Sequence, residues 1–377
     1  MKTLFQIATW TLMSLCVAMN ASAAKHHPNS QKRWAWLGFE RPEGVNPIIS
    51  PDTNSVFFCP MTGGPMKWEE SDTFNPAAAV IGDKVVVLYR AEDNTHQGIA
   101  SRTSRIGYAY SEDGLHFKRL PAPVIYPGGD DQARWEVPGG CEDPRVAMTE
   151  DGTYIILYTQ FDRDHMLARL GIATSRDLVT WKKYGSPFEK AYGGKYAHQF
   201  NKSASIVTTM KDGKQVIAKI NGKYYMYWGE NFVNVATSTD LINWTPMLND
   251  KGELLKVMVP RKGYFDSSLT ECGPPAILTD DGIILFYNGK NETPQRGGDK
   301  NYTAGAYCAG QALFDKDDPT HLIDRLDEPF FKPELSFEKS GQYPAGTVFI
   351  EGLVPFQGKW FLYYGCADSK VGVAVKK

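Results

Sequence analysis

The sequence predicts an all-β protein, and within that class a five-bladed β-propeller. Three observations lead to this prediction: short apolar strands recur along the chain, Gly/Asp turns join them, and no amphipathic helix of any length lies between them. Five repeats are too few for a solenoid, and radial repetition is the usual way in which β-meanders protect their edges. A two-sheet sandwich is the structural alternative, because it also contains many short strands and turns.

The repeating unit is a β-meander, and internal repeats of this kind decide the architecture. The first strands of the five copies are expected at 75–81, 143–148, 203–207, 274–278 and 352–356. The second strands are expected at 85–90, 154–158, 224–228, 283–287 and 360–364. The last copy ends after three strands. We therefore expect the N-terminal arm to supply a closing strand.

The chain divides into three parts. Residues 1–23 match a secretory signal, with Lys2, an apolar run and the small-residue site Ala21-Ser22-Ala23. This segment predicts export to a periplasm or to the cell exterior. Residues 24–70 form an irregular arm, and residues 71–377 form the propeller. No later segment approaches the ~20 apolar residues that a transmembrane helix needs, so no membrane span is expected.

Composition narrows the range of partners. The 377 residues include 41 Lys+Arg and 43 Asp+Glu without a basic block, which argues against a nucleic-acid partner. The 19 Tyr, 19 Phe and 9 Trp are typical of strands and of surfaces on which sugar rings stack. The mature chain keeps an odd number of cysteines and no CxxC pair, which predicts buried free thiols. No metal-ligand spacing appears, so neither a metal nor a cofactor is expected.

Three acidic residues stand where a propeller would gather them. The first strand of each blade lies nearest the axis, so the residues that precede these strands ring one mouth of the channel. Asp143 and Glu271 hold comparable positions in the second and fourth copies, and Glu230 ends a strand of the third. Carboxylates that face each other across a funnel suit glycoside hydrolysis. An acidic turn paired with Arg145, and a solvated loop acid at Glu230, are the structural alternatives.

Two arginines are further candidates. Arg90 ends a strand of the first copy, and Arg105 begins the next strand. Each guanidinium could hold sugar hydroxyls or an anion through several donors, or could belong to a structural ion pair.

Six short motifs carry a family resemblance. They are Phe74-Asn75-Pro76-Ala77-Ala78, Tyr89-Arg90-Ala91-Glu92, Ser104-Arg105-Ile106-Gly107, Gly140-Cys141-Glu142-Asp143-Pro144-Arg145, Cys272-Gly273-Pro274-Pro275 and Tyr363-Tyr364-Gly365-Cys366-Ala367-Asp368. From about residue 70 onward the chain resembles glycoside hydrolase family 130, whose members are five-bladed propellers that act on β-mannosides. The resemblance implies that Asp143 is the general acid. It also implies that Asn75, Arg90, Arg105 and Asp368 contact the mannose before the scissile bond.

The family contains both phosphorylases and hydrolases. Phosphorylase members hold phosphate with basic side chains from the third and fourth blades, where this chain has Glu230 and Glu271. Two carboxylates repel phosphate but can polarise a water molecule. The chain resembles the branch of the family that acts on β-1,2-linked mannosides. We therefore expect an inverting β-1,2-mannosidase acting on a mannose-containing oligosaccharide, in which both glutamates activate water and Asp143 has a raised pKa.

Three alternatives to this expectation stay open. They are a phosphate-dependent β-mannoside phosphorylase that releases mannose 1-phosphate, a glycosidase that cleaves pentosides, and a propeller that binds glycans without catalysis.

Overall fold

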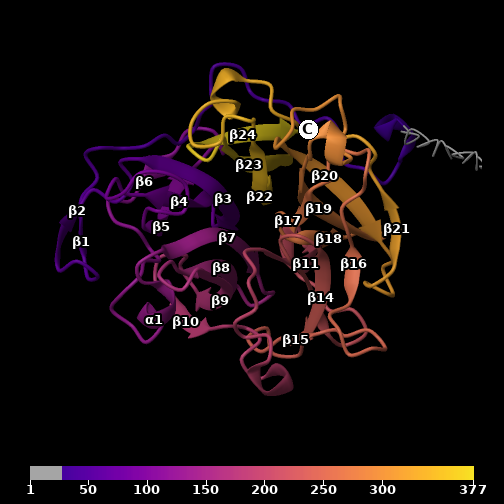
Figure 1. Cartoon of the computed structure of the whole chain (residues 1–377), viewed down its shortest axis with the longest axis horizontal. Coiled ribbons are helices and arrows are strands. Elements are labelled where there is room, and N and C mark those ends of the chain that lie inside the picture. Colours follow the sequence, from indigo (N-terminus) through magenta and orange to yellow (C-terminus); the bar gives the residue numbers. More distant parts are fainter. Residues whose placement is uncertain (1–27) are drawn as a thin grey trace, which may run out of the picture.

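The computed structural model describes residues 28–377 (Figure 1), so the predicted signal segment 1–23 lies outside the described residues. The described chain consists almost entirely of strands, turns and loops. Its helical segments are all short: η1 (Asn29–Gln31), α1 (Ala133–Glu136), η2 (Ala191–Gly194), η3 (Pro294–Arg296) and η4 (Ser336–Glu338). The all-β part of the prediction is therefore confirmed. Between residues 28 and 377, no helix is long and apolar enough to cross a membrane.

The strands form consecutive antiparallel meanders. A short hairpin, β1 (Phe57–Cys59) and β2 (Gly64–Met66), precedes them. The first meander consists of β3 (Asp72–Ile81), β4 (Lys84–Glu92), β5 (Ser104–Ser111) and β6 (Lys118–Arg119). The second consists of β7 (Gly140–Met148), β8 (Tyr154–Asp162), β9 (Leu167–Ser175) and β10 (Lys182–Gly185).

The later meanders follow the same plan with additions. The third consists of β11 (Ala204–Lys211), β13 (Tyr224–Trp228), β14 (Val233–Ser238) and β15 (Thr245–Pro246), extended by β12 (Lys214–Ile217) and β16 (Lys256–Met258). The fourth consists of β17 (Leu269–Cys272), β18 (Ala276–Leu278), β19 (Ile283–Lys290), β20 (Tyr307–Phe314) and β21 (Leu322–Arg325). The fifth consists of β22 (Val348–Phe356), β23 (Lys359–Cys366) and β24 (Lys370–Lys376).

The hydrophobic core is divided among the spaces between neighbouring meanders. One cluster packs the first meander on the second, and three others join the second to the third, the third to the fourth and the fourth to the fifth. The remaining cluster joins the fifth meander back to the first, through residues such as Val354 and Tyr363 against Val87 and Tyr89. The packing order is therefore cyclic.

Each meander is buried on both faces, which explains its sequence pattern. Val85 to Tyr89 on β4 all have 0% exposure, so this strand is a continuous apolar run rather than an alternating one. In Figure 1, β3, β7, β11, β18 and β22 lie toward the middle, whereas β6, β10, β15 and β21 lie toward the periphery. The first strands of the meanders therefore surround the centre of the molecule.

The N-terminal arm runs along the last strand. Glu40 and Ile49 form antiparallel bridges with Val375 and Val371 of β24. Between these bridges, the side-chain amide of Asn46 donates to the carbonyl of Val373 at 2.8 Å and accepts from its N–H at 2.8 Å. These bonds hold the first and last parts of the described chain together.

The cysteines match the sequence prediction. All five cysteines of the described chain are buried and free, so the predicted buried thiols are confirmed. Within residues 28–377 no group of His, Cys, Asp and Glu is arranged to hold a metal ion.

A buried asparagine links the fourth meander to the fifth. Asn288 on β19 has 0% exposure, and its amide nitrogen donates to the carbonyl of Ile350 at 3.1 Å. Its amide oxygen accepts from the Ile350 N–H at 2.8 Å. One side chain thus satisfies both backbone groups of a β22 residue, as a neighbouring strand would.

We predict that Asn288→Ala lowers the free energy of unfolding by about 2–4 kcal/mol, because it leaves two buried backbone groups unpaired. Urea denaturation of the whole chain measures this loss. Asn54→Ala, at an exposed position, is the control and should change stability by less than about 0.5 kcal/mol. Equal stabilities of the two variants would contradict the assigned role of Asn288.

Candidate active site

A cavity of about 260 Å³ lies where the first strands of the meanders begin. Six of the seven site residues predicted from the sequence line it: Asn75, Arg90, Asp143, Glu230, Glu271 and Asp368. They come from all five meanders, and most of them are buried. Asn75 and Asp368 line the same cavity although they are 293 positions apart in the sequence.

Local backbone irregularities aim these side chains into the cavity. Asn75 and Asp143 each precede a proline, each has a φ of 46°, and each lies where the register of its strand shifts. Glu351 lies at a comparable shift on β22. A bulge of this kind turns a side chain out of the ladder that its neighbours follow. A Cβ at Gly365 would overlap the side chain of Asn75, so this glycine makes room for the bulge.

Asp143 is surrounded by hydrogen-bond donors. Its Oδ1 accepts from Asn75 Nδ2 at 2.8 Å and from Arg90 Nη1 at 3.0 Å. Its Oδ2 lies 3.4 Å from Lys202 Nζ. The carboxyl group is only 3% exposed, so these contacts replace most of its hydration. All of them favour the charged form of the carboxyl group.

The expected raised pKa of Asp143 is wrong for this structure. Burial alone would raise the pKa, but the Lys202, Arg90 and Arg145 cations and the Asn75 hydrogen bond together hold it well below its usual value. The sequence expectation considered burial and the charge of Glu142, but it did not include three converging cations. The three cations therefore favour the ionised form of Asp143.

Arg90 joins the acids of the first and second meanders. Its Nη2 lies 2.7 Å from Glu92 Oε1 and 2.8 Å from Glu142 Oε1, and its Nη1 holds Asp143. Its Nε donates to Ser104 Oγ at 3.0 Å. One planar guanidinium thus positions three carboxylates, which a lysine could not do with the same geometry.

Glu230 and Glu271 lie in a less compensated part of the cavity. Burial raises the pKa of Glu271 well above its usual value, the charge of Glu230 raises it further, and Arg145 opposes both effects. Burial also raises the pKa of Glu230, against the attraction of Lys202. Arg145 Nη2 is 3.8 Å from Glu271 Oε1, and Glu230 Oε2 has no hydrogen-bond partner within the described chain. The pKa values of both carboxyl groups are therefore raised, and Glu230 Oε2 is free to bind a small polar molecule.

Arg145 is the anchor beneath the cavity. Its Nη1 donates to the carbonyls of Asp143 at 2.9 Å and Lys202 at 3.2 Å, and its Nη2 donates to the carbonyl of Cys272 at 2.9 Å. Glu351, with 0% exposure, lies 2.9 Å from Arg145 Nη1. The guanidinium thereby ties the segments that carry Asp143, Lys202, Glu271 and Glu351.

Asp368 also lines the cavity, from the turn between β23 and β24. Burial raises its pKa to about 7, although Arg90 lowers it. Its backbone carbonyl accepts from Gln342 Nε2 at 3.0 Å, and the same nitrogen donates to Glu92 Oε2 at 3.1 Å. Asp368 can therefore exchange a proton near neutral pH.

Arg105 is the one predicted residue that does not line the cavity. It has 0% exposure, and its Nη1 is 2.8 Å from Asp93 Oδ2. Successive side chains of a strand point to opposite faces, so Ser104 reaches the Arg90 cluster while Arg105 points toward Cys59 and Met66. The predicted sugar contact is corrected to the structural ion pair that the sequence left as an alternative.

Several lining residues were missed by the sequence reasoning. Lys202 precedes β11, and its Nζ is 2.9 Å from Glu142 Oε2. Lys202 stands just before the first strand of the third meander. Asp143 and Glu271 were predicted from comparable positions, so the same reasoning could have found Lys202. Glu92, which ends the motif Tyr89-Arg90-Ala91-Glu92, also lines the cavity. Gln342, Tyr307 and Tyr343 line it too, and none of the motifs contains them.

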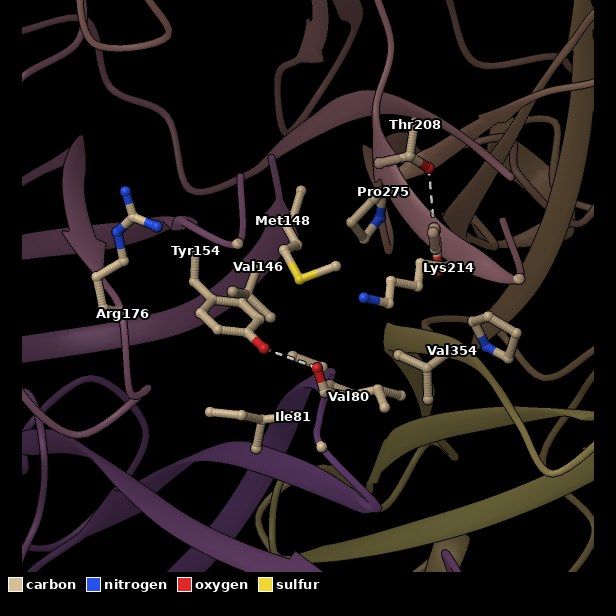
Figure 2. Close-up of a pocket in the computed structure, with 18 residues that line it drawn as sticks. Val80, Ile81, Val146, Met148, Tyr154, Arg176, Thr208, Lys214, Pro275 and Val354 are labelled. Atoms are coloured by element: carbon tan, nitrogen blue, oxygen red, sulfur yellow. Dashed lines mark hydrogen bonds between the residues drawn. The ribbon is translucent and has the colours of Figure 1, made fainter. Parts of the chain in front are cut away.

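A second cavity, of about 370 Å³, lies at the far ends of the same strands (Figure 2). Val80, Val146, Met148 and Val354 form much of its wall, and Tyr154 donates to the carbonyl of Val80 at 2.7 Å. No carboxyl side chain lines this cavity. It lacks the acid and base groups of the first cavity, so the chemistry belongs to the acidic one.

Comparison with known proteins identifies the family. Residues 53–377 match the family described as beta-1,4-mannooligosaccharide phosphorylase. The 1,2-beta-oligomannan phosphorylase of Thermoanaerobacter sp. (strain X514) is 32% identical over 311 residues, which are 82% of this chain and 91% of that protein. A glycosyl hydrolase structure from Bacteroides ovatus is 60% identical with a TM-score of 0.88, and covers 91% of this chain and 94% of its own.

A further solved structure is also 60% identical, with a TM-score of 0.89, over 91% of this chain and 94% of that chain. It is described in terms of GH130 mannoside phosphorylases that include glycoside hydrolases targeting beta-1,2 mannosidic linkages in Candida mannan. These matches over most of the chain place the protein among the mannoside-processing enzymes. This chain belongs to glycoside hydrolase family 130, which confirms the prediction from its motifs.

We predict that Glu351→Ala lowers the free energy of unfolding by about 3–5 kcal/mol, because it removes the carboxylate that lies 2.9 Å from the buried Arg145 guanidinium. Urea denaturation of the whole chain measures the effect. Glu334→Ala removes a 56%-exposed partner of Arg41 and is the control, with an expected loss of at most about 1 kcal/mol. A Glu351 variant as stable as this control would show that the buried pair is not an anchor.

Proposed function

We propose that this chain hydrolyses β-1,2-linked mannosides with inversion of configuration. The observation that carries the proposal is that Asp143, Glu230 and Glu271, from three different meanders, line one cavity together with the sugar-binding candidates. Inverting hydrolysis needs an acid on one side of the scissile bond and a base that activates water on the other. The solved structure described in terms of hydrolases that target beta-1,2 mannosidic linkages supports this substrate.

We further propose that the five meanders are the blades of a β-propeller and that the arm closes the last blade. The cyclic order of the core clusters and the central position of the first strands support this arrangement. The bridges from Glu40 and Ile49 to β24 support the closing role of the arm. In this arrangement residues 24–70 are the arm, residues 71–377 are the catalytic propeller, and the cavity is one mouth of its channel.

The proposed roles follow from the local charges. Glu230 and Glu271 orient and deprotonate the attacking water, because their raised pKa values make them stronger bases than ordinary glutamates. Asn75, Arg90 and Asp368 hold the mannose before the scissile bond. Asp143 passes a proton toward the leaving oxygen, directly or through a sugar hydroxyl.

Asp143 needs a source for that proton, because the neighbouring cations lower its pKa and favour its ionised form. Neighbouring carboxyl groups can supply one, since burial raises the pKa of Asp368 to about 7. A bound sugar also excludes the remaining water from Asp143, which raises its pKa toward that of its neighbours.

Phosphorolysis is the second candidate, and the 32%-identical phosphorylase favours it. The charges of the cavity favour hydrolysis. The two cations that line the cavity are already shared: Lys202 lies 2.9 Å from Glu142 and 3.4 Å from Asp143, and Arg90 contacts three carboxylates. Glu230 and Glu271 add further negative charge where phosphate would have to approach. A neutral water molecule does not meet this repulsion.

We also propose that residues 1–23 direct export, so that the enzyme works in a periplasm or outside the cell. Hydrolysis suits that location, because a sugar phosphate is most useful where it can enter metabolism directly.

We predict that purified enzyme releases mannose from β-1,2-mannobiose at the same rate with and without inorganic phosphate, because water is the nucleophile. Product analysis by chromatography, with NMR to read the first anomer formed, measures this. The expected products are free mannose with an initial α-anomer. Phosphate-dependent release of mannose 1-phosphate would establish the phosphorylase instead, and sugar binding without product would establish a binding protein.

We predict that Glu271→Gln lowers kcat by about 10²–10⁴-fold, because the amide cannot accept the proton of water. KM should change far less, since the shape of the cavity is kept. Steady-state kinetics on β-1,2-mannobiose measure both constants. Glu253→Gln, at an exposed position outside the cavity lining, is the control. A Glu271 variant within twofold of the wild-type kcat would remove this residue from the base.

A further inference from the structure

The acidic cavity has an apolar rim that none of the proposed catalytic roles uses. Ile99, Met166 and Phe200 line the cavity, yet their exposures are 58%, 63% and 49%. They come from three separate segments: the β4–β5 loop, the β8–β9 turn and the linker before β11. Exposed apolar side chains that gather at one cavity mark a binding surface more often than chance exposure does.

Polar bonds hold the three segments together beneath these side chains. Arg163, in the β8–β9 turn, donates through Nη1 to the carbonyl of Ser101, and to that of Arg102 at 3.3 Å. The N–H of Asn201 donates to the carbonyl of Ala168 at 3.0 Å, which ties the linker to β9. The rim is therefore a preorganised surface, and its apolar side chains are left free by the bonds that fix its backbone.

The backbone of the rim is also strained. Ala100 and Met166 have φ values of 62° and 50°, in the left-handed region that favours glycine. Met166 occupies such a position with its side chain mostly exposed, so no core packing compensates for the strain. A residue kept in this conformation against its own preference points to a function for its side chain.

The rim shares its meanders with the proposed acid. Asp143 belongs to the second meander, and the rim comes from the first two meanders and the linker that follows them. Glu230 and Glu271 belong to the third and fourth meanders. In an inverting displacement the leaving group departs on the acid side, opposite the water. The sugar ring that leaves therefore faces the rim.

We propose that Ile99, Met166 and Phe200 form the leaving-group subsite, which packs against the apolar C–H face of the sugar on the reducing-end side of the scissile bond. This inference rests on the proposed function, because it takes the acid side from Asp143. It makes the substrate a mannoside whose leaving group is itself a sugar, and it makes small leaving groups poor ligands for this part of the cavity.

The test compares two substrates that differ only in the leaving group. β-1,2-Mannobiose places a sugar on the rim, whereas β-mannosyl fluoride places a single atom there. In Met166→Gly, Ile99→Ala and Phe200→Ala, the ratio of kcat/KM for mannobiose to kcat/KM for the fluoride should fall about 10-fold or more. Phe58→Ala removes an exposed ring outside the cavity lining and should keep the wild-type ratio.

Thermal unfolding separates this role from a structural one. Met166→Gly relieves the positive φ, so its Tm should equal or exceed that of the wild type while the ratio falls. Wild-type ratios in both Met166→Gly and Phe200→Ala would overturn the subsite.

If the wild type cleaves neither substrate, the proposed hydrolysis fails, and calorimetry then tests the rim alone. Wild-type protein should bind mannobiose more tightly than mannose, and the rim variants should lose that preference. Equal binding of the two sugars by the wild type would overturn the subsite.

Discussion

The candidate site depends on one buried guanidinium. Arg145 donates to the backbone carbonyls of Asp143, Lys202 and Cys272 and pairs with Glu351. These carbonyls belong to segments where the strands bend or break, so the usual ladder does not satisfy them. Arginine suits this position because it carries five donors in a rigid plane and stays charged when buried. The carboxyl groups above it keep fixed relative positions because their backbones share this single partner.

The same irregularities that create the need for Arg145 also create the site. A regular inner strand would alternate its side chains between two neighbouring meanders and present none of them to the central cavity. The register shifts at Asn75, Asp143 and Glu351 turn these residues away from that alternation. Positive φ at Asn75 and Asp143 is tolerated because Asn and Asp are the least strained non-glycine residues in that region. Asn75 and Asp143 therefore tolerate the positive φ of the bulge and also present a polar side chain to the cavity.

The sequence predicted the features that depend on local pattern. Continuous apolar strands and Gly/Asp turns repeat with a visible period, and a following proline marked Asn75 and Asp143, which lie inside β3 and β7 at register shifts. It failed where the outcome depends on three-dimensional neighbours. The direction of Arg105 follows from a register relative to Ser104, and the low pKa of Asp143 follows from Lys202, Arg90 and Arg145, which arrive from different parts of the chain. The family resemblance predicted Arg105 as a site residue, whereas the strand directs its side chain away from the cavity.

The crowding of carboxyl groups has a chemical consequence of its own. Burial and the neighbouring carboxylates raise the pKa values of Glu271, Glu351 and Asp368. Lys202, Arg90 and Arg145 favour the ionised form of Asp143, whereas burial raises the pKa values of Glu271 and Asp368. A sugar that enters displaces water and shifts this balance. In the proposed reaction, proton supply and proton uptake are therefore properties of one coupled cluster, and the nucleophile that such a cluster admits most readily is uncharged.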